Sequence, residues 1–303
     1  MNALPADLTI RTIEQVSTRT SLGIRFWDAA TDTQIRADLR VLLWPELSPR
    51  LRVPGRRSVS DIYAFHRIPG LRSVETPLPG EAADLGSPPV RDYVIEVRDD
   101  RDRFVPVAFG LTLPRPGSAL YLNEIPAAGG LPAPGFYLFT AANRVTVPAM
   151  GVIRGDLVRG SDGRPAAHAL VTVEIPGEPL ALSISDSGGR FAIHLPLPTL
   201  RGGLASLDAS PMASPLPPVA ERDWPFTLTV HSEPGALAPL PGTDLPDLRS
   251  ILQQAPATIR IDTASPPLFG ADWAGILSYG GEVVVSTAGR SSLEIEAAGS
   301  PPL

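Results

Sequence analysis

The 303-residue chain contains no cysteine and no lysine, so all 26 of its basic side chains are arginines. Without cysteine there is no disulfide, no thiol nucleophile and no cysteine-based metal site. Without lysine there is no P-loop lysine for phosphate, no Schiff base and no Ser–Lys dyad. We interpret the exclusive use of arginine, together with 35 prolines and 27 glycines, as the composition of a high-GC bacterial gene.

Long apolar runs and excess positive charge are also missing. No stretch reaches the roughly 18 consecutive apolar residues that a membrane-spanning helix needs. The N-terminal sequence MNALPADLTIRTIEQ lacks a basic segment followed by an apolar core, so we expect no signal peptide. A formal net charge of −6 argues against general binding to nucleic acid. These features predict a soluble protein made in the cytoplasm.

The centre of the chain carries the clearest pattern of short strands. Segments 152–158, 169–175, 180–185 and 191–195 are rich in alternating apolar or β-branched residues. Turn sequences such as Asp-Gly, Pro-Gly and Gly-Gly separate them, because glycine reaches left-handed backbone angles without steric cost. Four short strands spaced in this way predict a small antiparallel β-sandwich.

The same region opens with GVI at 151–153, continues through the DGRP turn at 162–165 and approaches its last strand with SDSGGRF at 185–191. In these features it resembles the carboxypeptidase regulatory-like domains, a family of prealbumin-type β-sandwiches. The resemblance implies a sandwich over residues 149–232. Such domains serve as spacers or docking modules, so the resemblance implies no chemistry.

Residues 1–114 are predicted to form a second sandwich of the same kind. Strands are expected at 22–27, 37–44, 61–66 and, as a hairpin, at 93–97 and 104–109, which Pro106 marks as an edge. An offset of 128 relates this region to the central one, and we therefore consider an internal duplication as a hypothesis. The offset takes Ile24 to Val152, Leu42 to Leu170, Tyr63 to Phe191, Ala64 to Ala192 and His66 to His194.

The remaining segments are predicted to be linkers and an extension. Residues 115–148 form a Pro/Gly-rich linker whose aromatic part, GFYLFT, docks on a sheet. Residues 233–303 form a C-terminal extension with one short helix at 245–254, capped by Thr243 or Asp244. The extension ends in a tight β-hairpin formed by strands at 281–287 and 291–296. The predicted fold is thus all-β, with two tandem small antiparallel sandwiches, Pro/Gly-rich linkers and a C-terminal hairpin extension.

No motif for catalysis, cofactor binding or metal binding is present. The chain has no G-x-S-x-G elbow, and the nearest segment, GILSYG at 275–280, has the wrong spacing. No phosphate loop or dinucleotide fingerprint follows a predicted strand. We therefore predict a protein that is not an enzyme and has no catalytic, cofactor-binding or metal-binding residues. The side chains weighed as metal ligands are His66, His168, His194, His231 and the acidic turn of Asp99, Asp100 and Asp102, which alternate with Arg98, Arg101 and Arg103.

Two further groups of side chains have both a binding interpretation and a structural one. Four arginines are either a patch for an acidic partner or part of a solvated loop: Arg50, Arg52, Arg56 and Arg57. Four aromatic residues are either a platform for a carbohydrate or part of the core: Trp44, Tyr121, Trp224 and Trp273.

The N-terminal half contains four groups of motifs: FWDA at 26–29 with Asp38 and Leu39, IYAFH at 62–66 with IPGLR at 68–72, YVIEVRD at 93–99 with FVPVAF at 104–109, and FTA at 139–141 with the run to 147–148. In these motifs it resembles accessory proteins from gene clusters for contractile, phage-tail-like injection particles. That resemblance implies a structural or assembly subunit of such a particle, as a cap, an adaptor or a baseplate-associated protein, and it brings no catalytic residues.

The implied partners are other structural proteins of the particle, such as sheath, tube, cap or baseplate subunits, and further copies of the chain. Neither nucleic acid nor membrane insertion is expected. The resemblance implies assembly in the cytoplasm into a particle that is released outside the cell. The alternative from another functional class is a soluble β-sandwich module that binds a carbohydrate or a surface ligand.

Overall fold

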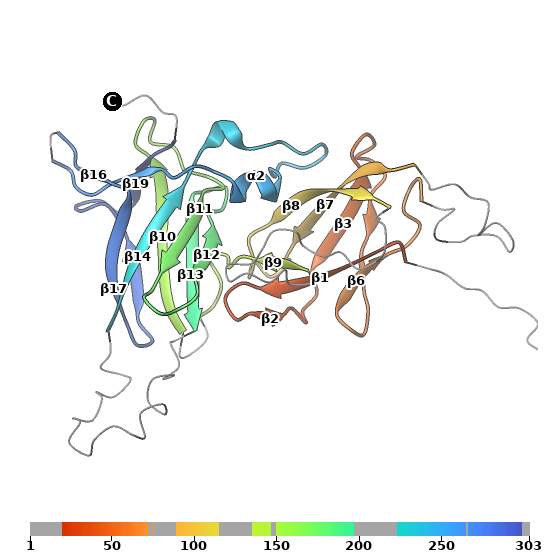
Figure 1. Cartoon of the computed structure of the whole chain (residues 1–303), viewed down its shortest axis with the longest axis horizontal. Coiled ribbons are helices and arrows are strands. Elements are labelled where there is room, and N and C mark those ends of the chain that lie inside the picture. Colours follow the sequence, from red (N-terminus) through yellow and green to blue (C-terminus); the bar gives the residue numbers. More distant parts are fainter. Residues whose placement is uncertain are drawn as a thin grey trace, which may run out of the picture.

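The computed structural model describes residues 20–71, 75, 89–114, 135–146, 150–196, 223–264 and 266–298. Strands dominate these residues, which confirms the all-β prediction. They form two β-sandwiches that lie side by side along the long axis of the molecule (Figure 1). Within this part of the chain, no helix is long and apolar enough to cross a membrane.

The first sandwich consists of two sheets. One has the strand order β2-β1-β6-β5 and gains β9, which runs parallel to β1; the other has the order β4-β3-β7-β8. The predicted hairpin is confirmed, because β7 and β8 pair antiparallel and β8 is an edge strand. The strands are β1 (Leu22–Asp28), β2 (Thr33–Gln34), β3 (Arg40–Pro45), β4 (Val53–Pro54), β5 (Arg56–Arg57), β6 (Ile62–Phe65), β7 (Arg91–Arg98), β8 (Val107–Leu113) and β9 (Phe136–Leu138).

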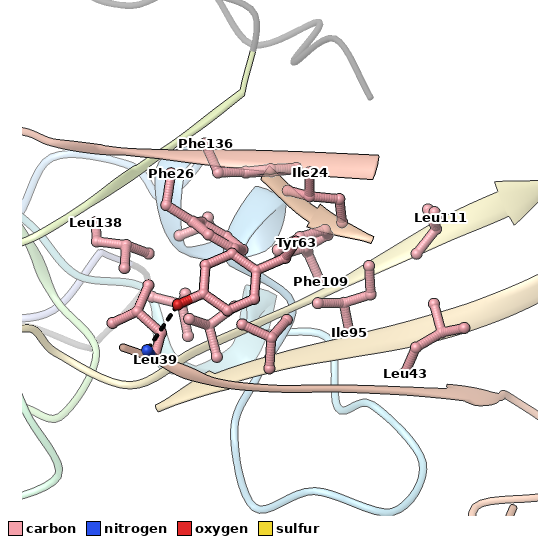
Figure 2. Packing of buried hydrophobic residues seen from close by; sticks show 14 of the residues in the cluster. Ile24, Phe26, Leu39, Leu43, Tyr63, Ile95, Phe109, Leu111, Phe136 and Leu138 are labelled. Carbon is pink, nitrogen blue, oxygen red and sulfur yellow. Dashed lines mark hydrogen bonds between the residues drawn. The ribbon is translucent and has the colours of Figure 1, made fainter. Parts of the chain in front are cut away.

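Aliphatic and aromatic side chains together fill the core of the first sandwich, as Figure 2 shows. Phe136 of β9 stacks on Phe109 with ring centroids 3.8 Å apart, so the aromatic part of the predicted linker does dock on a sheet. Tyr63 lies edge-on to Phe26 at 5.5 Å. Its buried hydroxyl accepts a hydrogen bond from the Leu39 amide at 2.7 Å, which satisfies a polar group that burial would otherwise penalise.

The second sandwich also has two sheets. One has the order β12-β11-β14-β17, and the other has the order β13-β10-β19-β15-β16 with β18 paired to β10. The four central strands expected from the sequence are confirmed within a few residues at each end. The strands are β10 (Met150–Arg159), β11 (Leu170–Glu174), β12 (Ala181–Ile184), β13 (Arg190–Pro196), β14 (Asp223–His231), β15 (Thr258–Arg260), β16 (Phe269–Gly270), β17 (Asp272–Ser278), β18 (Glu282–Val285) and β19 (Leu293–Glu296).

The predicted C-terminal hairpin is wrong. β18 and β19 share no ladder among the described residues, and both pair in parallel with the long strand β10. Val285 and Leu293 are fully buried in the second core, and this burial outweighs the local pairing that a tight turn would favour. Residues 233–303 therefore supply strands to both sheets of the second sandwich.

The helix predicted at 245–254 is shorter than expected and is capped by a different residue. Helix α2 (Leu248–Leu252) begins after Asp247, whose side chain accepts a hydrogen bond from the Arg249 amide at 2.9 Å. The predicted caps, Thr243 and Asp244, were wrong because their side chains bind the first sandwich instead. A 3-10 helix, η3 (Pro234–Ala236), precedes this segment.

The two sandwiches share one strand arrangement. In the first sandwich, β1 pairs antiparallel with β6 and parallel with β9. In the second sandwich, β10 pairs in the same way with β13 and β18. In both, the opposite sheet runs in the order β4-β3-β7-β8 or β12-β11-β14-β17. The topology agrees with an internal duplication.

The offset of 128 does not hold for every strand. Tyr63 and Phe191 both face their cores, as the offset requires. Leu22 pairs with Phe65, however, so the offset would pair Met150 with Ile193. The partner of Ile193 is instead Ile153, three positions further along β10. The expected match of Ile24 with Val152 is therefore wrong, since Ile24 lies in the first core and Val152 is on the outer face of its sheet.

Candidate functional site

A segment of the second sandwich covers the outer face of the sheet β4-β3-β7-β8. We call residues 237–252, which include α2, the clamp. Trp44 on this outer face is fully buried, and its indole N–H donates to the Pro241 carbonyl at 2.8 Å. Asp247 forms a parallel bridge with Ala108 of β8. Figure 1 shows α2 between the two sandwiches. The clamp therefore fixes one sandwich to the other.

A network of charged and polar side chains anchors the clamp. Arg98 donates to Glu96 at 2.9 Å and to Asp244 at 2.5 Å, and the Thr243 hydroxyl donates to Glu96 at 2.5 Å. Burial opposes ionisation of Glu96, but the hydrogen bonds from Arg98 and Thr243 outweigh it and lower its pKa. The carboxylate is therefore held in its ionised form as an acceptor.

A recess with a volume of about 480 Å³ lies beside this network. Its cations are already paired: Arg40 lies 3.5 Å from Asp100, and Arg52 donates to the Gly242 carbonyl while stacking 4.6 Å from the Trp44 ring centre. The hydrogen bond from Arg98 also lowers the pKa of Asp244, so the two carboxylates of the recess, Glu96 and Asp244, are both ionised at neutral pH. The lining residues are Arg40, Leu42, Arg52, Glu96, Arg98, Gly242, Thr243 and Asp244.

A buried ion pair of the first sandwich lies close to His194 of the second sandwich. Arg144, which follows β9, donates to both oxygens of Asp28, at 3.0 and 2.6 Å. His194 of β13 is 3% exposed, and its Nδ1 atom has no hydrogen-bond partner. Burial, and secondarily the positive charge of Arg144, lower the pKa of His194. The imidazole is therefore neutral near pH 7 and packs as part of the junction.

The four histidines do not come together. His66 is exposed and lies 3.3 Å from the Thr20 hydroxyl. The His168 carbonyl accepts from the Gln254 side chain, and His231 Nδ1 lies 3.3 Å from the Gln254 carbonyl. Within the described ranges, no group of three or more histidine, aspartate or glutamate side chains is arranged to hold a metal ion.

The acidic turn is occupied by its own arginine. The buried Asp99 carboxylate accepts from the Arg103 amide at 2.9 Å and from the Arg103 guanidinium at 2.7 and 2.8 Å. Burial opposes ionisation of Asp99, but the bonds from Arg103 outweigh it and lower its pKa. Asp100 is exposed and faces Arg40, and Asp102 adopts a left-handed φ of 52°. This geometry stabilises the turn between β7 and β8.

The four arginines divide between different roles. Arg52 belongs to the clamp network. Arg57 lies near Asp38 and Asp61 at 3.3 and 3.4 Å and also donates to the Arg36 carbonyl. Arg50 and Arg56 are exposed. They do not form one patch.

The aromatic platform is not supported where the structure describes it. Trp44 is fully buried beneath the clamp, so its interpretation as an exposed sugar-binding residue is wrong. Trp273 is half-buried and packs on Phe226 at 5.7 Å, and Trp224 packs against the same core. Tyr121 lies outside the described residues.

Two structural features were missed from the sequence: the clamp and strand β17. The clamp looks like a proline-rich loop in sequence, and only its partner surface gives it structure. β17, with the sequence DWAGILS, was considered only as part of a failed hydrolase motif, although its uncharged apolar centre is a strand signal. Comparison of the chain with protein families, curated proteins and solved structures gives no match.

Proposed function

We propose that the protein is a non-enzymatic structural subunit of a contractile, phage-tail-like particle, in a cap, adaptor or baseplate position. The observation that carries the proposal is the fixed junction between the two sandwiches. A binding module on a free linker needs no such junction, whereas an assembly subunit must hold its docking surfaces at a constant separation.

The junction has the chemistry of a permanent contact. Leu248 and Ile251 of α2 belong to the same buried cluster as Phe109 of the first sandwich. The buried pair of Asp28 and Arg144 belongs to the first sandwich, and its charges lie close enough to His194 of the second sandwich to act on the pKa of that imidazole. Apolar burial supplies the stability, and the directional polar contacts define the orientation.

The residues that carry the family resemblance also have structural roles. Phe26 and Tyr63 lie in the first core, and Asp28 binds Arg144. A resemblance carried by such residues concerns the frame of the first sandwich. It supports a subunit role and gives no reason to expect catalysis.

The proposal is tested by pull-down of the tagged full chain from its native host. We expect rods with sheath and tube proteins, seen by negative-stain microscopy and peptide mass spectrometry, assembled in the cytoplasm before release. Arg98→Ala should reduce recovery because it removes a clamp contact, whereas the exposed Arg56→Ala serves as the matched control. Recovery of the wild-type protein alone would contradict the proposal and favour binding of a surface ligand.

A further inference from the structure

Strand β17 (Asp272–Ser278) has an edge that nothing in the described part of the chain pairs with. β17 pairs with β14 over seven residues on one side and is the last strand of its sheet. Figure 1 places it at the end of the second sandwich farthest from the first. An unpaired edge presents a row of backbone N–H and C=O groups that can bind another strand.

Among the residues that the structure describes, nothing covers this edge, and its central part lacks the usual protection. Proteins block edge strands with charges, prolines, bulges, short length or a covering segment. In the first sandwich, β5 is two arginines, β4 ends in a proline, and the equivalent of β17, which is β8, is covered at Ala108 by Asp247. By contrast, the five central residues of β17 are uncharged and include no proline, and Ile276 is 61% exposed.

The sequence of β17 is complementary to itself. When two copies run antiparallel about a two-fold axis at Gly275, Asp272 of one copy lies opposite Ser278 of the other. Ala274 then lies opposite Ile276 on the exposed face, and Trp273 lies opposite Leu277 on the inner face. The two Asp272 carboxylates lie at opposite ends of the paired strands, so like charges do not meet. A single patch that fits itself is what a two-fold dimer requires.

We infer that β17 pairs with β17 of a second copy, joining the two sheets β12-β11-β14-β17 into one continuous antiparallel sheet centred on Gly275. The occupant of the free edge is thus a second copy of this chain. This inference concerns the purified chain and does not depend on the particle, so its failure and that of the proposed function are distinguishable.

Sedimentation of the purified full chain over a range of concentrations tests the pairing. We expect a species with twice the 32.1-kDa mass of the chain. Ile276→Lys should lower the mass about twofold because it introduces a charge on the edge strand. Thr227→Lys is the matched control, since Thr227 is exposed on the same sheet directly beside Ala274 but on the inner strand β14. A monomer at every concentration, or an Ile276→Lys variant that remains a dimer with unchanged circular dichroism, would overturn the inference.

The absence of cysteine allows a test of the register. Opposed residues in an antiparallel pair have Cα atoms about 4.5–5.5 Å apart, which permits a disulfide. A mixture of Ala274→Cys and Ile276→Cys chains should therefore form the mixed disulfide on mild oxidation, in preference to either homodimer. Thr227→Cys chains should not cross-link. Cross-linking of Ile276→Cys with itself but not with Ala274→Cys would overturn the proposed register, and with it the inference.

Discussion

The two sandwiches share a strand arrangement but differ in how much of the equivalent sheet is covered by other parts of the chain. In the first, the outer face of the sheet β4-β3-β7-β8 is covered by the clamp, and Trp44 on it is fully buried. In the second, the equivalent sheet β12-β11-β14-β17 ends in an open strand whose Ile276 is exposed. The same strand arrangement therefore has a covered outer sheet in the first sandwich and an open edge strand in the second.

The largest effect on the free energy of unfolding is expected when a tryptophan of the first sandwich is compared with one of the second. Trp44→Ala should lower the free energy of unfolding by about 3–5 kcal/mol, because it leaves a cavity beneath the clamp and removes the bond to Pro241. Trp273→Ala, at a half-buried position, should cost about half as much. Urea unfolding followed by circular dichroism measures both. Equal losses would show that the clamp does not seal the first sheet.

The ion pairs provide the next comparison. Asp28→Ala should cost about 3 kcal/mol, because it leaves the Arg144 guanidinium buried without its partner. Glu282→Ala breaks a pair with Arg154 in which both side chains are more than 40% exposed, and should cost at most about 1 kcal/mol. The double variant Asp28→Ala/Arg144→Leu should recover part of the first loss. The same urea experiment decides between these outcomes.

His66 and His194 are equivalent positions with opposite burial, and pH should distinguish them. The charged groups around His194 are Arg144, Asp28 and Arg154, and its pKa in the folded state lies below its ordinary value of 6.5. As the pH falls, His194 is therefore protonated in the unfolded chain before it is protonated in the folded protein. The stabilising contribution of neutral His194 is complete above about pH 6.5 and is lost as the pH falls toward the lowered folded-state pKa.

Replacement of each histidine by glutamine tests this linkage. His194→Gln should reduce the loss of stability on acidification below pH 6.5, whereas His66→Gln changes only an exposed side chain and serves as the control. His168 contributes in the same direction, because burial also lowers its pKa, so part of the pH dependence remains in the His194 variant. An unchanged pH profile in His194→Gln would contradict the prediction. The measurement is urea unfolding between pH 5 and 8.

The smallest effect on the free energy of unfolding is expected for a substitution on the open edge strand β17. Ile276→Ser should change the free energy of unfolding of the monomer by no more than about 0.5 kcal/mol, because its side chain is mostly in water. The measurement is made at a protein concentration low enough to keep the chain monomeric. A loss of several kcal/mol would mean that Ile276 is packed within its own chain.

Local patterns were sufficient to predict most strands. Alternating apolar residues located β10, β11 and β13, and the Asp-Gly turn was confirmed by Gly163, whose φ is 68°. The docking of Phe136 was also predicted, because three aromatic residues within a proline-rich stretch indicate a buried surface. That the protein is not an enzyme stays a prediction.

Features that depend on distant partners could not be read from local sequence. Pro241, Thr243 and Asp244 look like ordinary loop residues, and their contacts lie on β3 and β7 of the other sandwich. β18 and β19 follow a turn that favours a hairpin, but the long strand β10 offers both of them more buried apolar surface. In each case a long-range surface outweighed a local preference.

The clamp also has a consequence for synthesis on the ribosome. Trp44 and its acceptor Pro241 are 197 positions apart in the chain. The first sandwich is complete only when β9 (Phe136–Leu138) has been made, so at about 5–20 residues per second it waits roughly 5–20 s for Pro241. During that interval the outer face of the sheet β4-β3-β7-β8, with Trp44, is not yet covered by the clamp. The rate of translation of the second half therefore sets how long the newly folded first sandwich can form non-native contacts through its uncovered face.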